Sequence, residues 1–387
     1  MASGSCDVRL LIFVIVALFI LIQIRLFATQ SRYADDIVTS ESRKFKMKDG
    51  VHLSPLNEFQ ASFAAVVIVA CNRPDYLERT ITSILKYQIS VASKFPMFIS
   101  QDGTNPDVKS KALSYSQITY MQHLDFEPVE TERPGEIVAY YKIAKHYKWA
   151  LDELFFKRNF SRVIILEDDM EIAPDFFDYF EATATLLDND KSVMAVSSWN
   201  DNGQRQFVHD AEALYRSDFF PGLGWMLTKS TWAELSPKWP KAYPLRSILF
   251  FACFVAGSSM GQFFHQYLEP IRLNDVKVHW KEMELDYLLE GNFLSYFTKM
   301  VAGVKPLGVD FVGKASSMDG DVRIKYNNQA EFEQIAHQFG IFSEWRDGIP
   351  RTAYKGVVVF RYHTSKRIFL VGPDSLMKLG IEKSLSA

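Results

Sequence analysis

The stretch AVVIVACNRPDYLERTITSILK, residues Ala65 to Lys86, decides the fold. Its first six residues, Ala65 to Ala70, form a continuous apolar run, which is typical of a strand buried on both faces of a sheet. A turn over Cys71 to Pro74 follows, and a helix is predicted over Asp75 to Lys86. A buried strand that leads directly into a helix predicts an α/β fold.

The same alternation of strands and helices continues along the chain. Further strands are predicted over Met97 to Ser100, Ile118 to Gln122, Arg162 to Leu166 and Val193 to Ser198. Helices are predicted over Tyr140 to Phe156 and Asp175 to Leu187. This pattern predicts a Rossmann-like domain, residues 63–309, with a mostly parallel sheet and helices on both faces. Ligands of such sheets bind at the carboxyl ends of the strands.

The pattern changes from about residue 310 onward. Strands are predicted over Arg323 to Tyr326, Gly356 to Tyr362 and Arg367 to Val371, with one helix over Glu331 to Phe339. We therefore expect residues 310–387 to form a small appended α+β domain.

The N-terminus carries an unbroken apolar run, LLIFVIVALFILI, over Leu10 to Ile22. With its flanks to Ala28 it approaches the length of about 20 residues that a membrane span needs. No small-x-small cleavage site follows, so we expect an uncleaved signal anchor over residues 10–28, after a tail of residues 1–9. A cleaved signal peptide is the alternative. The polar residues 29–62 are typical of a stem or linker.

Composition narrows the classes of function. The 387 residues are 48% hydrophobic and 23% charged, which is ordinary for a globular protein. The net charge of −3 comes from residues spread along the chain, and the lack of a basic block argues against nucleic acid as a partner. Cys6, Cys71 and Cys253 are too few and too scattered for a disulfide framework or a structural zinc site.

The strongest local feature is the acidic triplet Glu167, Asp168 and Asp169, directly after the apolar strand in RVIILEDDMEI. Adjacent carboxylates at a strand end need a cation or a hydrogen-bond donor. Mg²⁺ and Mn²⁺ are bound by one or two carboxylates together with substrate phosphates. A nucleoside-diphosphate sugar needs such an ion, because the metal offsets charge on the leaving diphosphate. The alternative is that these acids cap the helix that follows Pro174.

Arg73 and Asp102 follow the first and second predicted strands, at the same edge of the sheet as the triplet. A nucleotide needs a cation near its phosphates and an oxygen acceptor for its base and ribose. The alternatives are an N-cap partner for Arg73 and an ordinary turn aspartate for Asp102. Together, the two residues favour a nucleotide site.

Long motifs along the chain resemble the N-acetylglucosaminyltransferase I family, and their wording is most similar to its plant members. Besides residues 66–85, they are SQDG (100–103), YYKIAKHYKWAL (140–151), VIILEDDMEIAPDFFDYF (163–180), SSWNDNG (197–203), YRSDFFPGLGWML (215–227), SMGQFF (259–264), YLEPIRLNDV (267–276) and GIPRTAYKGVVVF (348–360). The resemblance covers nearly the whole chain after the stem, apart from one segment.

The resemblance implies a GT-A fold, a Mn²⁺ cofactor and inverting transfer of GlcNAc from UDP-GlcNAc. The acceptor would be the α-1,3 mannose arm of a high-mannose N-glycan on a glycoprotein, and the new linkage β-1,2. It also implies a single-pass type II protein of the Golgi membrane with its catalytic domain in the lumen. A homo-oligomer, or a hetero-oligomer with other Golgi transferases, is left open.

The same resemblance implies a role for each candidate residue. Asp169 would be the metal ligand, Asp168 would contact the ribose or diphosphate, and Glu167 would contact the donor sugar. Arg73 and Asp102 would hold the uridine end, Ser259 would belong to a loop that closes over UDP, and the turn Phe219 to Trp225 would help line the sugar pocket.

One segment departs from the family. After Tyr243 the family continues with Trp-Asp-Asp-Trp, and one of these aspartates is its catalytic base. This chain instead reads PLRSILFFACFVA over Pro244 to Ala256, without an acid or a histidine. The segment resembles an alternatively spliced or intron-derived insertion. The catalytic base is therefore unknown, and Glu167 is a weak stand-in.

Three functions remain open. The first is an active transferase that uses another carboxylate as its base. The second is a catalytically inactive splice-type variant that binds UDP-GlcNAc and metal or partners the active enzyme. The third is a related GT-A transferase with another acceptor.

The signal anchor gives a direct prediction. N-terminal sequencing of the mature membrane protein should find the apolar run Leu10 to Ile22 still attached. A soluble product that starts near residue 29 would show instead that the run is a cleaved signal peptide.

Overall fold

The computed structural model divides the chain into two compact units, Met1–Pro55 and Leu56–Ala387. It describes residues 62–132, 134, 136–204, 207–208, 210–220, 222–241, 273–274, 276–307, 319–362 and 366–382, all in the second unit. The expected tail, anchor and most of the stem, the segment Pro244 to Ala256 and the loop residue Ser259 lie outside these ranges. Within them, no helix has the length and apolar character that crossing a membrane requires.

The first sheet has six strands in the order β3-β2-β1-β4-β6-β5. Its four parallel strands are β1 (Ala65–Ala70), β2 (Met97–Asp102), β3 (Ile118–His123) and β4 (Arg162–Glu167). β6 (Trp225–Thr228) runs antiparallel to β4, and β5 (Val196–Ser197) runs antiparallel to β6. The expected α/β fold with a mostly parallel sheet is confirmed.

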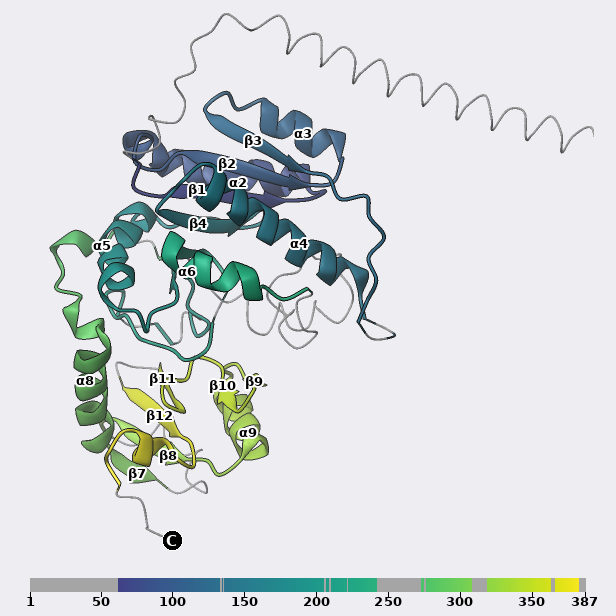
Figure 1. Cartoon of the computed structure of the whole chain (residues 1–387). Helices are drawn as coiled ribbons and strands as arrows, with labels where there is room; N and C mark the ends of the chain where they lie inside the picture. Colours follow the sequence, from purple (N-terminus) through teal and green to yellow (C-terminus); the bar gives the residue numbers. More distant parts are fainter. Residues whose placement is uncertain are drawn as a thin grey trace, which may run out of the picture. The chain divides into compact units, whose positions relative to one another are not determined.

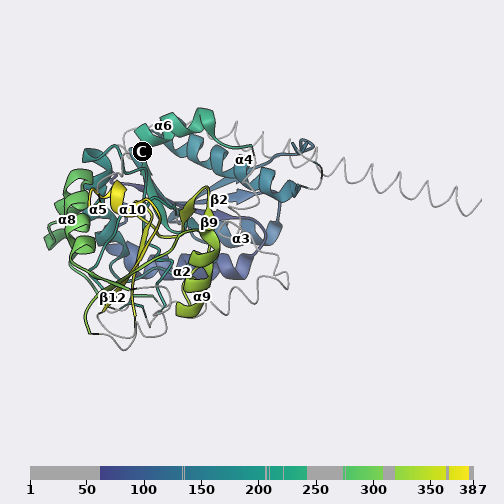
Figure 2. The same ribbon diagram turned by 90° about the horizontal axis from the view of Figure 1, so that it is seen from below.

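Helices cover both faces of this sheet (Figures 1 and 2), as the alternating apolar strands predict. One face packs against α2 (Pro74–Gln88), α3 (Pro106–Leu113) and α5 (Phe176–Asn189). The other packs against α4 (Val138–Asp152) and α6 (Lys229–Leu235). Because side chains alternate along a strand, β1 sends Val66 and Ile68 to the first face and Val67 and Val69 to the second.

Most expected elements of this part are present, with shifted ends. The long helix expected over Tyr140 to Phe156 is α4 followed by a π-helical turn, Glu153–Lys157. The strand expected over Val193 to Ser198 is shorter, because only β5 pairs with β6. α3, α6 and β6 were not expected from the sequence. Short 3-10 turns lie at Ile89–Val91, Ser236–Lys238, Trp280–Glu282 and Asp286–Leu288.

A second sheet has the order β11-β12-β8-β7. Its strands are β7 (Lys305–Leu307), β8 (Val322–Lys325), β11 (Val357–Arg361) and β12 (Arg367–Val371). α9 (Gln329–Phe339) packs on one face, and α8 (Glu290–Ala302) and α10 (Ser375–Lys378) pack on the other. A small hairpin joins β9 (Trp345–Arg346) to β10 (Ile349–Pro350). The expected boundary at residue 310 falls between two neighbouring strands of this sheet, β7 and β8, and it stays a prediction.

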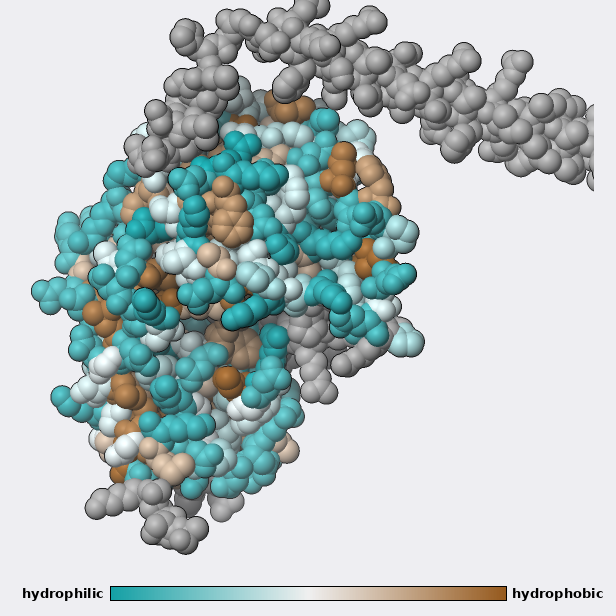
Figure 3. Space-filling model, in the orientation of Figure 1, coloured by the Kyte–Doolittle hydropathy of each residue, from teal (hydrophilic) through white to brown (hydrophobic). Residues whose placement is uncertain are grey.

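Two buried carboxylates, those of Asp201 and Asp190, connect the elements of the first sheet to those of the second. Arg351, which is 1% exposed and follows β10, pairs with Asp201 in the loop after β5 at 2.6 Å. It also pairs with Glu344 at 2.6 Å and lies over the Phe342 ring. On the face shown in Figure 3, the coloured side chains are mostly hydrophilic, with scattered hydrophobic ones, as a globular composition predicts.

Asp190, at the end of α5, is the other connection. Arg216 donates to its Oδ2 at 2.6 Å, and the backbone amide of Glu290, in the first turn of α8, donates to the same atom at 2.7 Å. Burial alone would raise the pKa of Asp190, but hydrogen bonds from Ser192 and Arg216 lower it to about 2. The ionised carboxylate therefore stabilises the fold.

We expect Asp190→Asn to lower the free energy of unfolding by about 2–4 kcal/mol at pH 7, because the partly buried Arg216 loses its anionic partner. The folded-state pKa lies below the unfolded value, so the carboxylate stabilises the fold above about pH 4. This stabilisation is lost as the pH falls toward 2. Urea denaturation at several pH values measures both effects.

Asp188→Asn is the matched control, since the Asp188 side chain is 44% exposed and pairs with Arg162 at the surface. It should change the free energy by less than about 1 kcal/mol. Equal losses in the two variants would contradict the role of Asp190.

Candidate functional site

The candidate site lies where β1 and β4 end. These strands are parallel neighbours, with Val69 of β1 opposite Glu167 of β4. The residues that follow each strand therefore emerge at one edge of the sheet. Arg73 is the N-cap residue of α2, but its side chain makes no cap hydrogen bond. Its guanidinium instead contacts Asp168 Oδ1 and, at 3.0 Å, Asp169 Oδ2.

The two aspartates differ in exposure. The side chain of Asp168 is 1% exposed and that of Asp169 is 31% exposed. Burial raises the pKa of Asp168 to about 6, although Arg73 acts in the opposite direction. Among the described residues, Asp168 Oδ2 is buried and has no hydrogen-bond partner. Such an oxygen needs a cation or a donor from beyond the described residues.

A divalent ion fits these residues. Within the described ranges, no group of three or more His, Cys, Asp or Glu side chains is placed to hold a metal. An ion held by Asp169, with or without Asp168, would have positions left for water or a ligand. Open carboxylate sites of this kind suit Mg²⁺ and Mn²⁺, which keep several non-protein ligands. The expectation of Asp169 as a metal ligand stays a prediction.

Glu167, the first acid of the triplet, contacts helix α4. It is the last residue of β4, and its Oε1 accepts a hydrogen bond of 2.9 Å from the hydroxyl of Tyr147 on α4. Burial, and then the charge of Asp169, raise the pKa of Glu167 to about 8. A raised pKa favours the protonated carboxyl, which is poorly suited to accept another proton. The raised pKa of Glu167 therefore weakens it further as a stand-in base.

Asp102 ends β2 as expected, and two histidines accompany it. His123 ends β3 opposite Asp102, and its Nδ1 lies 3.0 Å from Asp102 Oδ1. The ring of His146, from α4, stacks on His123 at 5.5 Å and bonds to Ser100 at 2.8 Å. Burial lowers the pKa of His146 to about 4, so its ring is neutral. The sequence analysis missed both histidines, although His123 follows the strand-end pattern of the other candidates.

The turn Phe219 to Trp225 packs against the acidic segment. Gly224 has φ +51°, and a Cβ atom there would lie 2.5 Å from Ser198 Oγ and 3.2 Å from Met170 Cε. Only glycine fits at this contact. The turn therefore lies beside the residues that follow β4, as the expected sugar pocket requires. Pro221 of this turn lies outside the described residues.

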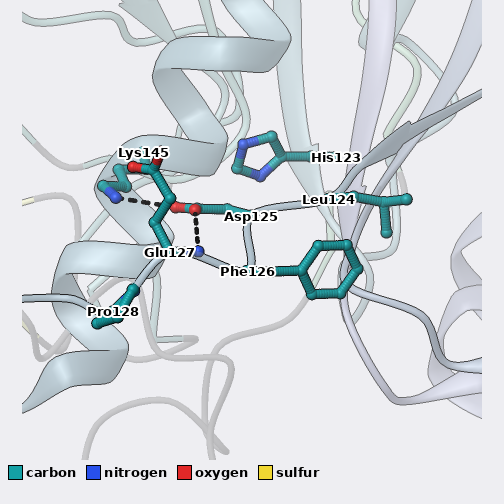
Figure 4. A pocket seen from close by; sticks show the side chains of 7 residues that line it. All are labelled: His123, Leu124, Asp125, Phe126, Glu127, Pro128 and Lys145. Atoms are coloured by element: carbon teal, nitrogen blue, oxygen red, sulfur yellow. Dashed lines mark hydrogen bonds and ion pairs between the residues drawn. The ribbon is translucent and has the colours of Figure 1, made fainter.

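A surface depression of about 620 Å³ lies beyond His123, lined also by Leu124, Asp125, Phe126, Glu127, Pro128 and Lys145. Lys145 reaches Asp125 from α4 at 2.9 Å, and Phe126 points away from this ion pair (Figure 4). Arg73, Asp102 and the acidic triplet do not line this depression. It therefore borders the candidate site without containing it.

A family model and a related protein both place the chain in the same family. The model of the GNT-I family matches residues 40–245 and 251–383. The alpha-1,3-mannosyl-glycoprotein 2-beta-N-acetylglucosaminyltransferase of Arabidopsis thaliana is 56% identical over 444 aligned positions, which cover 99% of this chain and 100% of the relative. Because the chain has only 387 residues, part of the relative has no counterpart here.

Solved structures are similar at a lower level. Glucosyl-3-phosphoglycerate synthase from Mycobacterium tuberculosis, in complex with Mn²⁺, UDP and phosphoglyceric acid, is 16% identical, covering 47% of this chain and 62% of its own, with a TM-score of 0.28. A mannosyltransferase from Pyrobaculum calidifontis, in complex with GDP-Man and Mn²⁺, is 15% identical, covering 80% of this chain and 77% of its own, with a TM-score of 0.29. Scores this low carry no inference about the site.

Tyr147→Phe should raise the pKa of Glu167 further, because the hydroxyl that favours the charged carboxylate is removed. An NMR titration of glutamate side chains labelled with ¹³C measures the change. Tyr140→Phe, at a half-buried position of the same helix, is the control and should leave the titration unchanged. An unchanged or lower pKa in Tyr147→Phe would contradict this account of the hydrogen bond.

Proposed function

Because the chain belongs to the GNT-I family, we propose that it binds UDP-GlcNAc with a divalent ion and is built to transfer GlcNAc to N-glycans. In this proposal the fold is GT-A, the transfer inverts the sugar, and the product is a β-1,2 linkage to the α-1,3 mannose arm. The observation that carries the proposal is the meeting of Arg73 with Asp168 and Asp169 at the ends of β1 and β4. The relative from Arabidopsis thaliana, whose name states this activity, supports it.

The donor is held along the carboxyl edge of the sheet. Arg73, at the uridine end, supplies the positive charge that the adjoining phosphate oxygens need. Asp102, with His123 beside it, supplies an acceptor at the uridine end. Asp168 faces the ribose or diphosphate. Asp169 would hold Mn²⁺, which would offset the charge of the leaving diphosphate.

Glu167 contacts the donor sugar rather than the acceptor proton. Its carboxyl, bonded to Tyr147 and with a pKa near 8, donates a hydrogen bond to a sugar hydroxyl more readily than it accepts a proton. The turn Phe219 to Trp225 closes the sugar side, since Gly224 contacts the residues after β4.

The attacking mannose hydroxyl must lose its proton, and this chain has no evident base for it. The family's base falls in the segment that Pro244 to Ala256 replaces, and these residues contain no acid and no histidine. The unmatched part of the relative and the gap in the family match after residue 245 support the replacement. We therefore propose that donor binding is retained and that transfer is slow.

The second candidate function is a catalytically inactive splice-type variant that binds UDP-GlcNAc and metal or partners the active enzyme. The acid-free segment Pro244 to Ala256 favours it. Measurable donor binding without any transfer would distinguish it from a slow enzyme.

The compartment follows from the same proposal. N-glycans are modified in the lumen, so the catalytic part would face the Golgi lumen behind a single-pass type II anchor at residues 10–28. Association with itself or with other Golgi transferases belongs to this proposal. Crosslinking of the chain in Golgi membranes, without any crosslinked product, would argue against such association.

Calorimetry on the full chain in detergent tests the donor side. Wild type should bind UDP more tightly with Mn²⁺ than without, and Asp169→Ala should lose this dependence on metal. Glu171→Ala, at the exposed acid two residues later, should keep it. Undiminished metal-dependent binding in Asp169→Ala would refute Asp169 as the metal ligand.

Turnover of the same preparation tests the missing base. With a mannose-terminated N-glycan, transfer should be about 10²–10⁴-fold slower than that of the relative from Arabidopsis thaliana. A version with the relative's segment in place of Pro244 to Ala256 should recover the rate. Transfer by the unaltered chain at the relative's rate would show that the replacement removed nothing essential.

A further inference from the structure

Arg73 already neutralises the acids that a metal and a nucleotide would use. Its guanidinium contacts Asp168 Oδ1 and lies 3.0 Å from Asp169 Oδ2. The same guanidinium lies 5.0 Å from the centre of the Tyr76 ring, and the side chain is 16% exposed. The acid pair therefore has a cation of its own within the chain.

We propose that Arg73 is an exchangeable counter-ion, which keeps a lone divalent ion off Asp169 and passes to the diphosphate when the nucleotide binds. This inference rests on the proposed function and adds a regulation of the same site. Metal and nucleotide then bind together, and neither binds well alone.

The repulsion follows from the distances. An ion such as Mg²⁺ bound to Asp169 would lie about 2.0–2.1 Å from a carboxylate oxygen. The guanidinium lies 3.0 Å from Asp169 Oδ2, so the two cations would be only a few ångströms apart. Like charges at that distance disfavour each other, and the partly buried position of Arg73 limits screening by water.

The exchange needs only one of the two contacts to break. Asp168 is buried and also accepts a hydrogen bond from the backbone amide of Cys71, so it stays in place as the inner partner. Asp169 is the outer and more exposed partner. A diphosphate that arrives with its metal brings negative charge for the guanidinium and a cation for Asp169. Each charge in the site then keeps an opposite partner.

The test measures binding of Mn²⁺ alone, without nucleotide, by calorimetry on the full chain. Arg73→Gln keeps a side chain that can hydrogen-bond to Asp168 but removes the positive charge. It should bind Mn²⁺ about tenfold more tightly than wild type, because the repelling charge is gone. It should also bind UDP, with Mn²⁺ present, about tenfold more weakly, because the diphosphate loses its cation. Opposite changes in the two affinities are the expected signature.

Two further variants act as controls. Arg73→Lys keeps the charge and should keep the weak binding of Mn²⁺ alone. Arg79→Gln removes an arginine from the same helix that lies over the same Tyr76 ring at 4.7 Å. It should change neither affinity. Equal tightening of Mn²⁺ binding in Arg79→Gln would show a general charge effect and overturn the assignment to Arg73.

A second comparison covers the case in which Arg73→Gln does not fold, since it leaves Asp168 buried without a cation. Asp168→Asn with Arg73→Gln removes the buried charge together with its partner and leaves Asp169 unchanged. The double variant should bind Mn²⁺ alone about tenfold more tightly than Asp168→Asn by itself.

The outcomes separate the two proposals. If the wild-type chain does not bind UDP, either alone or in the presence of Mn²⁺, the proposed function is refuted. A wild-type chain that binds them together, with no tightening of Mn²⁺ binding when Arg73 is replaced, would overturn the exchange alone.

Discussion

A carboxylate buried at the end of β4 requires a positive partner, and the candidate site depends on how the fold supplies one. Burial of an unpaired ion costs several kcal/mol, and the Asp168 side chain is only 1% exposed. The partner is Arg73, which is distant in sequence and becomes a neighbour because β1 and β4 pair in parallel. Without this strand order the acidic segment would stay exposed, and the nucleotide edge would lack its cation.

The neighbouring acids of this segment have separate roles because their surroundings differ. Glu167 accepts a hydrogen bond from Tyr147, and burial raises its pKa to about 8. Asp168 forms an ion pair with Arg73, which favours the charged form of the carboxyl. Asp169 is the most exposed of the three acids. One short stretch thus offers a hydrogen-bond donor, a buried anion and an accessible ligand.

The parallel core could be predicted from the sequence because its strands are uninterrupted apolar runs, such as Ala65–Ala70, and its candidate residues follow them. What could not be predicted depends on contacts between distant segments. The direction of β6 is set by its pairing with β4, and its short run of residues does not encode it. The place of His123 and His146 at the site depends on the stacking of their rings and on the contact of His123 with Asp102. The contact of Gly224 with Ser198 likewise appears only in three dimensions.

The position of the first sheet in the chain has a consequence for protein synthesis. All six of its strands lie between Ala65 and Thr228, so the ribosome completes them before the departing segment after Tyr243 is made. Domains generally fold as units, with the N-terminal part first during synthesis. A change of message that alters only residues after Tyr243 therefore leaves all of these strand sequences as they were. The cost of such a change falls on the later part of the chain, while the sequence of the central sheet is unaltered.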